Sequence, residues 1–283
     1  MNVGLRSPLS HRATNAARRS AAAVARGERE LPTYFVIGAK RAGTTSLNEY
    51  LVQHPNVQRG LVEKGSRYFD VNFGRGWGWF TRNFPSTRSI DRIERRTGVR
   101  PILGESSPYY CYHPEAPARI AARLPEARLV MLVREPVARA WSHYHYERTL
   151  GFEPLGIHDA LDQEDARLAA GTPQERAHAD RHFGYVARSQ YADQIERVRR
   201  HFPGAQLLVL ESEALFRDPQ GTMDVVYEYV RLPAYQGDFA SAFKQNRYDE
   251  VPDDVVARLA PLMEASTARL PGLGVTASWL PSA

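Results

Sequence analysis

The feature that most constrains this chain is a glycine-rich turn that separates a short apolar run from an amphipathic segment. Residues 33–38 read TYFVIG, a β-branched and aromatic run that predicts a buried strand. Residues 44–53 carry apolar side chains at helical spacing. Residues 38–45, between them, read G-x-x-x-x-G-T-T. Such a strand–loop–helix unit belongs at the carboxyl edge of a parallel sheet, where ligands bind.

Further apolar runs at 128–133 (RLVMLV) and 206–210 (QLLVL) predict two more buried strands. The intervening segments have helical character, near 116–124, 159–169, 185–201, 222–230 and 254–269. Strands that alternate with helices predict an α/β fold, with a mostly parallel sheet covered by helices on both faces. We expect one domain over residues 33–283, preceded by a basic, disordered tail at 1–32.

The loop at 38–45 has the frame of a phosphate-binding loop, but it lacks one residue of the nucleotide triphosphatase motif. That motif requires a lysine after the second glycine, which reaches the β- and γ-phosphates. Thr44 stands at that position here. Backbone amides and a helix N-terminus still favour an anion at this place. The loop therefore predicts a site for a phosphate-like group rather than for a triphosphate with its metal ion.

A second polar cluster follows the strand predicted at 128–133. Arg134 comes directly after that strand, and Ser142 lies eight residues further on, about two helical turns. An arginine fork and a serine hydroxyl suit a terminal phosphate. Because both loops follow parallel strands, we expect them at the same edge of the sheet. Together they predict two separate anion-binding points.

In these motifs the sequence resembles the 3′-phosphoadenosine 5′-phosphosulfate (PAPS)-dependent sulfotransferases, in the style of the heparan-sulfate-type branch and its soluble bacterial relatives. The family's K-x-G-T-T motif reads R-A-G-T-T at 41–45, and its L-R-(D/N)-P-x-x-R-A-x-S-x-Y motif is matched by residues 132–144, with Val133 inserted. Residues 64–70, 104–110 and 244–259 are also similar to family segments. The resemblance covers nearly all of the chain after the basic tail.

The resemblance implies a sulfotransferase fold with PAPS as cofactor and no metal ion. It further implies transfer of a sulfuryl group to a hydroxyl or amine of a small-molecule, lipid or sugar acceptor. The cofactor-binding residues that it implies are Lys40, Arg41, Ala42, Gly43, Thr44, Thr45, Ser46, Arg134, Ser142, Lys244 and Arg247.

The catalytic cation is the first departure from the family pattern. Relatives carry lysine at the position of Arg41, and Lys40 is its neighbour. A cation there neutralises charge on the oxygen that leaves sulfur. Arginine keeps its charge but is a poor proton donor. We therefore predict that Arg41 is an electrostatic clamp and that Lys40 is the alternative.

The general base is the second departure, because relatives often carry glutamate at the position of Gly65. Glu105 is the preferred substitute, since it follows a short apolar run and can be directed into a cleft. The alternative for Glu105 is a structural carboxylate paired with an arginine. Glu63, His143 and His145 are the other candidates.

The charge distribution argues against a nucleic-acid partner. The formal net charge is +5, but the tail before Pro32 holds six arginines and two glutamates, which leaves the body near neutral. A nucleic-acid or acidic-lipid tether and an organelle-targeting peptide are the alternatives for this tail. One cysteine, Cys111, and the lack of a membrane-spanning apolar run lead us to expect a cytoplasmic protein. The sequence predicts no oligomeric state.

Two other functions fit the same motifs. One is a small-molecule kinase of the phosphate-loop type, which Thr44 in the lysine position disfavours. The other is a non-catalytic relative that binds PAPS or its product 3′-phosphoadenosine 5′-phosphate (PAP). The substitutions at Arg41 and Gly65 are the reason to consider this second alternative.

Overall fold

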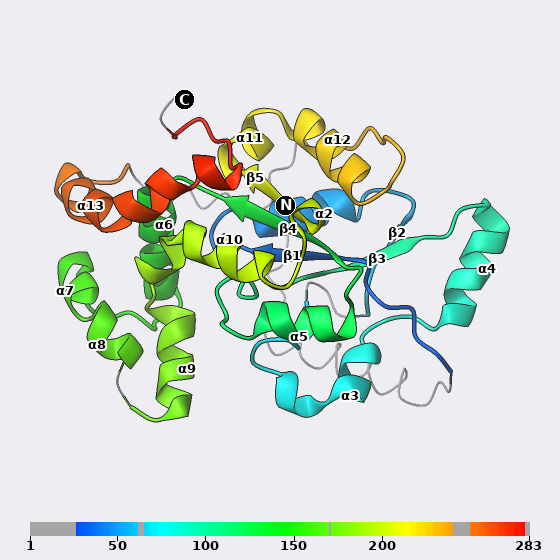
Figure 1. Ribbon diagram of the computed structural model, residues 1–283, viewed down its shortest axis with the longest axis horizontal. Helices are drawn as coiled ribbons and strands as arrows, with labels where there is room; N and C mark the ends of the chain where they lie inside the picture. Colours follow the sequence, from blue (N-terminus) through cyan, green and yellow to red (C-terminus); the bar gives the residue numbers. More distant parts are fainter. Residues whose placement is uncertain (1–26, 62–64, 170, 240–249, 281–283) are drawn as a thin grey trace, which may run out of the picture.

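A layer of parallel strands with helices on both faces organises the chain (Figure 1). The structure is a computed structural model, and it describes residues 27–61, 65–169, 171–239 and 250–280. Five strands form the sheet in the order β2-β3-β1-β4-β5. Their bounds are β1 Tyr34–Gly38, β2 Val57–Gln58, β3 Ile102–Ser106, β4 Arg128–Val133 and β5 Leu207–Glu211.

The two central strands place the two predicted anion-binding motifs next to each other. Every residue of β1 is buried, as are the last five residues of β4. The two strands pair in parallel, with Gly38 opposite Met131. The chain therefore leaves both strands at the same edge of the sheet, as the order of motifs predicts.

Helices cover the sheet on two sides: α2, α11 and α12 lie on one face, and α5 and α10 on the other (Figure 1). Helices α6, α7, α8 and α9 stand beyond the carboxyl ends of the strands. The bounds are α2 Thr44–Leu51, α3 Trp77–Thr81, α4 Thr87–Thr97, α5 Ala116–Arg123, α6 Pro136–Thr149, α7 Ile157–Asp162, α8 Glu164–Ala169, α9 Pro173–His182, α10 Tyr191–Arg199, α11 Ser212–Arg217, α12 Pro219–Tyr229 and α13 Asp253–Arg269. This arrangement follows from right-handed crossovers that run in opposite directions from β1.

The predicted α/β fold is confirmed, but two predicted helices are divided. The segment predicted as one helix at 159–169 forms α7 and α8, which meet at Gln163. The segment at 185–201 begins with a short 3-10 turn before α10. One residue explains why residues 185–187 leave the helical pattern: the buried Glu164 carboxylate accepts hydrogen bonds from their three backbone amides. Those amides are bound to a distant carboxylate instead of to helix carbonyls.

Strand β3 and helix α9 are elements that the sequence patterns did not predict. β3 contains Gly104, whose missing Cβ leaves room for the Tyr34 ring on the neighbouring strand, because a Cβ there would lie 2.0 Å from that ring. Helix α9 has hardly any apolar stripe to mark it, since its sequence PQERAHADRH is polar throughout. It starts instead at a capping box formed by Thr172 and Glu175.

Most of the predicted basic tail, residues 1–26, lies outside the described residues. Its end is paired with the body. The Glu30 amide donates to the Pro85 carbonyl (3.0 Å), and the Thr87 amide donates to the Glu28 carbonyl (3.0 Å). Residues 28 and 30 are therefore bound to the body, although the division into a tail and one domain stays a prediction.

Candidate functional site

The loop at residues 38–45 leaves β1 and enters α2 at the carboxyl edge of the sheet. Arg41 and Gly43 have left-handed backbone conformations, with φ of 74° and 88°, a region that glycine adopts most readily. A Cβ on Gly43 would also lie 3.1 Å from the Phe216 ring, so both conformation and space favour glycine. The Ala39 amide donates to the Leu132 carbonyl of β4 (2.7 Å). The first turn of α2 holds no acidic residue, so its positive end is not neutralised locally.

Three polar residues from the two loops converge beside this turn. Arg41 Nε donates to Ser142 Oγ (3.1 Å), and Arg134 Nη1 donates to the Arg41 carbonyl (3.4 Å). Ser142 is buried two turns into α6, and both arginines are half-buried. The Arg41 guanidinium also lies 4.6 Å from the centroid of the Tyr146 ring. The structure thus brings the two predicted anion-binding motifs together, and their role in binding stays a prediction.

Lys40 points to other partners than Arg41 does. Its ammonium forms a salt bridge with Glu147 of α6 and donates to the Arg181 carbonyl of α9 (2.8 Å). Burial and the positive charge of Arg188 lower the pKa of Lys40 to about 7, although Glu147 opposes them. Lys40 therefore ties the phosphate loop to α6 and α9.

Glu147, the salt-bridge partner of Lys40, is fully buried and has basic side chains around it. Its Oε2 accepts a hydrogen bond from His182 Nδ1 (2.7 Å). His143 Nε2 lies 3.2 Å from its Oε1, without the alignment of a hydrogen bond. Burial alone would raise the pKa of Glu147, but the two histidines and the charge of Lys40 hold it below its ordinary range. Glu147 is thus an anion that three basic side chains surround.

Arg139 adds a cation behind the loop. It is fully buried, and its guanidinium donates to Ser189 Oγ (2.7 Å), to the Lys40 carbonyl (3.5 Å) and to the Tyr185 carbonyl. Burial lowers its pKa to about 10. No carboxylate of the described residues lies within 4.0 Å of this guanidinium.

Arg188 is a second buried cation of the same kind. Its guanidinium lies 4.5 Å from the Tyr109 ring centroid and 4.7 Å from the Tyr112 centroid, and it donates to the Asp180 carbonyl (3.0 Å). In the part of the chain that the structure describes, it too has no carboxylate within 4.0 Å. A buried cation without a carboxylate is costly unless another anion reaches it. Both arginines therefore carry buried positive charge that no described carboxylate neutralises at close range.

Glu105, the predicted general base, is held by neutral donors. Its Oε1 accepts from the Ser66 amide (2.8 Å), Ser66 Oγ (2.7 Å) and Tyr110 OH (2.8 Å), with longer contacts to the Arg67 amide and Ser107 Oγ. Burial raises its pKa, and the bonds from Ser66 and Tyr110 oppose this. Oε2 is buried without a hydrogen-bond partner among the described residues. These contacts join β3 to residues 66–67, and the catalytic role of Glu105 stays a prediction.

Several predicted residues are placed elsewhere or lie outside the description. Lys244 and Arg247, the candidates in the cofactor-closing segment, lie outside the described residues, as does Glu63. His143 is fully buried beside Glu147. His145 packs its ring 4.1 Å from that of Trp141.

Sequence reasoning gave no role to four polar residues of this site: Arg139, which stands within the motif at 132–144, and Glu147, His182 and Arg188. One signal for part of the set was present. Residues 139, 143 and 147 recur every four positions along α6, and all three are buried. A buried helix face with polar side chains at that spacing indicates a polar network. No comparable signal marked His182 or Arg188, since their positions depend on contacts between distant segments.

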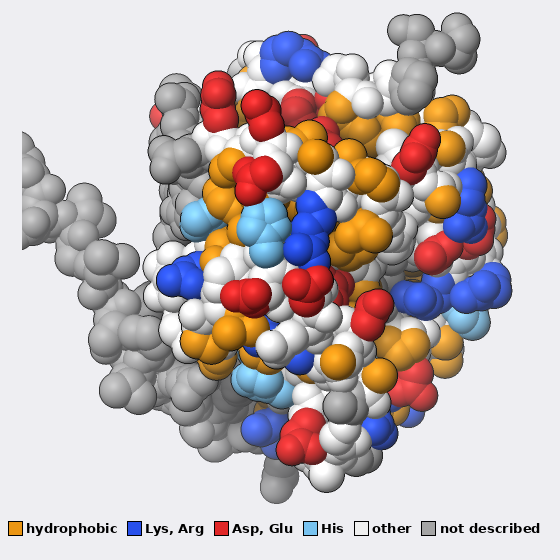
Figure 2. All heavy atoms as spheres, turned by 90° about the vertical axis from the view of Figure 1, so that its left-hand side faces the viewer, with side chains coloured by type: hydrophobic (Ala, Val, Ile, Leu, Met, Phe, Trp, Pro, Cys, Tyr) orange, Lys and Arg blue, Asp and Glu red, His pale blue; other side chains and the backbone are white. Residues whose placement is uncertain are grey.

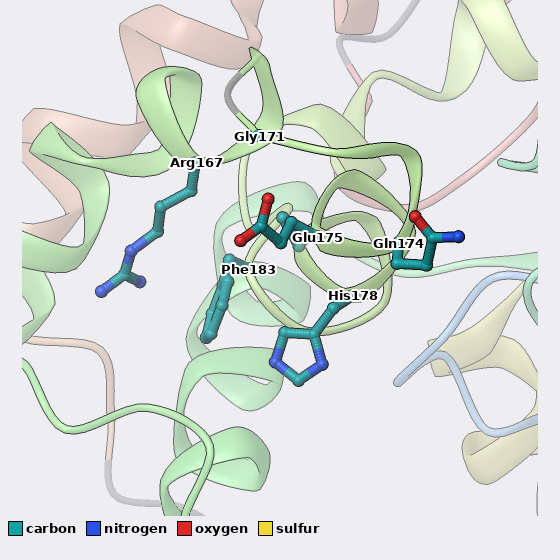
Figure 3. A pocket seen from close by; sticks show the side chains of 7 residues that line it. Arg167, Gly171, Gln174, Glu175, His178 and Phe183 are labelled. Carbon is teal, nitrogen blue, oxygen red and sulfur yellow. The ribbon is translucent and has the colours of Figure 1, made fainter.

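A surface pocket of about 460 Å³ opens between α8 and α9 (Figure 3). Its lining combines an aromatic ring with hydrogen-bonding side chains: Arg167, Gly171, Gln174, Glu175, His178, Ala179 and Phe183. Figure 2 shows the side of the molecule that carries α7, α8 and α9, where histidine, acidic, basic and apolar side chains are mixed. A mixed lining of this kind suits a polar ligand with an apolar face.

Two searches of the described residues gave negative results. None of the described helices is both long and apolar enough to span a bilayer. No group of three or more His, Cys, Asp or Glu side chains there is arranged to hold a metal ion.

Comparison with known proteins identifies the family. The family described as "Sulfotransferase domain" matches residues 31–265. Human heparan sulfate glucosamine 3-O-sulfotransferase 3B1 is 31% identical over 207 residues, which are 73% of this chain and 47% of the relative. Human bifunctional heparan sulfate N-deacetylase/N-sulfotransferase 3 is 28% identical over 229 residues, 77% of this chain and 24% of the relative. The chain thus spans half or less of the length of these relatives.

A solved structure agrees with this match. The sulfotransferase from Alicyclobacillus acidocaldarius superimposes with a TM-score of 0.65 and 25% identity, over 88% of this chain and 96% of that one. The α/β fold and the family resemblance predicted from the sequence motifs are both confirmed. Since the family match covers most of its residues, the chain belongs to the sulfotransferase family.

Proposed function

We propose that this protein transfers a sulfuryl group from PAPS to a hydroxyl or amine of an acceptor molecule. The observation that carries the proposal is the convergence of Arg41, Ser142 and Arg134 at one edge of the sheet. Two further arginines are buried near it, and no carboxylate of the described residues lies within 4.0 Å of either. An excess of buried positive charge is stabilised when an anion binds.

The residues fit a cofactor with two separated phosphate groups. The loop amides with Thr44, Thr45 and Ser46 suit the 5′-phosphosulfate, and Arg134 with Ser142 suits the 3′-phosphate. Thr44 cannot play the part of the lysine that a triphosphate requires. When bound, PAPS supplies an activated sulfuryl group. Lys244 and Arg247 remain predicted contacts on the closing segment.

Arg41 is the favoured catalytic cation, because its side chain lies beside Ser142 and the phosphate loop. There it stabilises the negative charge that develops on the departing phosphate oxygen. Lys40 is a weaker candidate, since its ammonium is bound to Glu147 and to the Arg181 carbonyl. We assign Lys40 to positioning of the loop.

The acceptor belongs to the small-molecule, lipid or sugar class. The two human relatives are named for heparan sulfate, which supports a sugar, and the mixed pocket between α8 and α9 supports a polar acceptor. The mixed charges in Figure 2 give no support for a nucleic-acid partner. A cytoplasmic location is part of the same proposal, and the single, buried Cys111 supports it.

Ligand binding separates the proposal from its nearest competitor. We expect PAP to bind tightly in calorimetry with EDTA present, and ATP with Mg²⁺ to bind at least about 100-fold more weakly, since the loop lacks the triphosphate-binding lysine. Arg96→Ala removes one positive charge on the exposed side of α4, and this control variant should bind PAP as the wild-type protein does. Tight binding of ATP with Mg²⁺ and none of PAP would favour a kinase.

Turnover then separates an enzyme from a non-catalytic relative. We expect [³⁵S]PAPS to label at least one member of a panel of phenols, amines, lipids and oligosaccharides. PAP binding without labelling of any acceptor, and without accelerated PAPS cleavage in water, would favour a PAP-binding module.

A further inference from the structure

The Glu147 carboxylate joins the phosphate loop to the end of α9. One of its oxygens accepts from Lys40, which directly precedes Arg41, and the other accepts from His182 Nδ1 (2.7 Å). Lys40 also donates to the carbonyl of Arg181, the residue before His182 (2.8 Å). Lys40 Nζ and His182 Nδ1 bind the two oxygens of the same carboxylate. The distance between these nitrogens is therefore at most about 8 Å, which is the sum of two hydrogen-bond lengths and the separation of the carboxylate oxygens. His182 lies at the rim of the predicted cofactor site.

The other nitrogen of His182 is directed away from this carboxylate. Nε2 makes no hydrogen bond within the described residues, and 16% of the side-chain surface is exposed. The ring packs against Phe152, with centroids 3.9 Å apart, and lies 4.5 Å from the His178 ring. His178 lines the pocket between α8 and α9. His178 and His182 are one turn apart on α9, so an acceptor molecule that contacts His178 in this pocket would lie next to His182.

A carboxylate that holds Nδ1–H fixes the tautomer of a histidine and leaves Nε2 as a base. We propose that His182, oriented by Glu147, is the general base that removes the proton of the acceptor hydroxyl or amine. This inference rests on the proposed sulfuryl transfer and names the residue that activates its acceptor. The charged groups that face His182 are Glu147 and Lys40, with His178 on its own helix.

The step balances with the groups already named. The acceptor oxygen gives its proton to His182 Nε2 and forms a bond to sulfur. The bond from sulfur to the bridging phosphate oxygen breaks, and its electron pair stays on that oxygen beside Arg41. The imidazolium is stabilised by Glu147 and later releases the proton to water.

Residue 65, His143 and Glu105 are less suited to this role. A side chain at residue 65 has no room, because a Cβ on Gly65 would lie 2.3 Å from the Ser106 carbonyl oxygen. His143 has no exposed side-chain surface. Glu105 is buried and accepts several hydrogen bonds through Oε1. His182 alone among these combines an orienting carboxylate with an accessible nitrogen.

The tautomer of His182 can be measured without turnover. In ¹⁵N-labelled protein at pH 7.5, we expect the His182 signals to show a protonated Nδ1 and an unprotonated Nε2, both with and without PAP. Loss of the signals in His182→Gln assigns them, and the exposed His201 is the internal reference. A proton on Nε2 and none on Nδ1 would overturn the proposal.

The second measurement compares turnover with PAP binding, using water as the acceptor. We expect His182→Ala to slow PAP release from PAPS about 100-fold, to keep the wild-type affinity for PAP within about twofold, and to regain part of the rate when imidazole is added. His201→Ala is the matched control and should retain wild-type behaviour. A wild-type rate in His182→Ala would contradict the assignment of His182 as the general base. A loss of rate that added imidazole does not reverse would contradict it as well. Failure of the wild-type protein to bind PAP contradicts the proposed function instead.

Discussion

Two neighbouring parts of the same sheet edge bury side chains of opposite charge, and these side chains have different kinds of partner. In one part, the arginines Arg139 and Arg188 are buried with carbonyls, hydroxyls and rings but without a carboxylate within 4.0 Å among the described residues. At the end of β3, Glu105 is buried with two serines and a tyrosine. One part holds buried cations that no described carboxylate neutralises within 4.0 Å, and the other holds a carboxylate whose Oε1 accepts hydrogen bonds from neutral donors of the protein.

The difference indicates which part binds and which part supports. The hydrogen bonds to Glu105 Oε1 all come from the protein, and no ligand is needed to complete them. They hold residues 66–67 against β3. The arginine-rich part holds buried positive charge that a bound anion would stabilise. Substitutions should therefore lower folding stability in the first part and ligand binding or turnover in the second.

Loss of the Glu105 carboxylate should have the largest effect. We expect Glu105→Ala to lower the free energy of unfolding by about 4 kcal/mol, because several buried donors lose their acceptor at about 1–3 kcal/mol each. The melting temperature should fall by about 10 °C, as measured by circular dichroism. Glu126→Ala, at an exposed position, is the control. Unchanged stability with lost turnover would instead make Glu105 a catalytic residue.

Arg41 and Lys40 should differ in kind, although they are adjacent. We expect Arg41→Ala to slow PAPS cleavage about 100-fold with little change in PAP affinity, because its charge stabilises the transition state. Arg41→Lys should keep most of the rate. Lys40→Ala should cause a smaller loss, since it removes only a positioning contact. If Arg41→Ala keeps turnover and Lys40→Ala abolishes it, the catalytic cation is Lys40.

Arg134 should affect binding itself. We expect Arg134→Ala to weaken PAP about 30-fold in calorimetry, the value of one charge-assisted hydrogen-bonding group, with an unchanged melting temperature. Arg134→Lys should recover only part of the affinity, because lysine lacks the planar fork. An equal loss in Arg96→Ala would mean that total charge, not this contact, controls binding.

Counted for each pH unit, the smallest expected effect is a pH dependence of stability at Lys40. Its pKa is about 7 in the folded protein, below the ordinary value of 10.5. The unfolded chain therefore binds more protons between these values, and the free energy of unfolding should rise with pH above 7 by up to about 1.4 kcal/mol per unit. The contribution is lost as the pH falls through 7. Denaturant titrations from pH 7 to 9 should show a weaker rise in Lys40→Met, and equal slopes would contradict the assignment.

The sequence alone predicted the frame of the site. The strand–loop–helix pattern at 38–45 and the strand before Arg134 are short-range patterns, so each could be recognised from consecutive residues. Parallel pairing of two buried strands then puts their carboxyl ends together, whatever lies between them. This is why the meeting of Arg41, Arg134 and Ser142 could be expected before any contact was known.

Only the tertiary structure decided which polar side chains contact each other. Lys40 and Arg41 are neighbours, yet Arg41 contacts Ser142 while Lys40 contacts Glu147, 107 residues away. The hydrogen bonds that Glu105 accepts from residues 66–67, and the one that Glu147 accepts from His182, likewise join separate segments. No local spacing encodes such pairs, because they depend on how α6 and α9 pack beyond the sheet. The sequence therefore determined which two loops meet at the predicted anion-binding edge, and packing determined which side chains contact one another beside it.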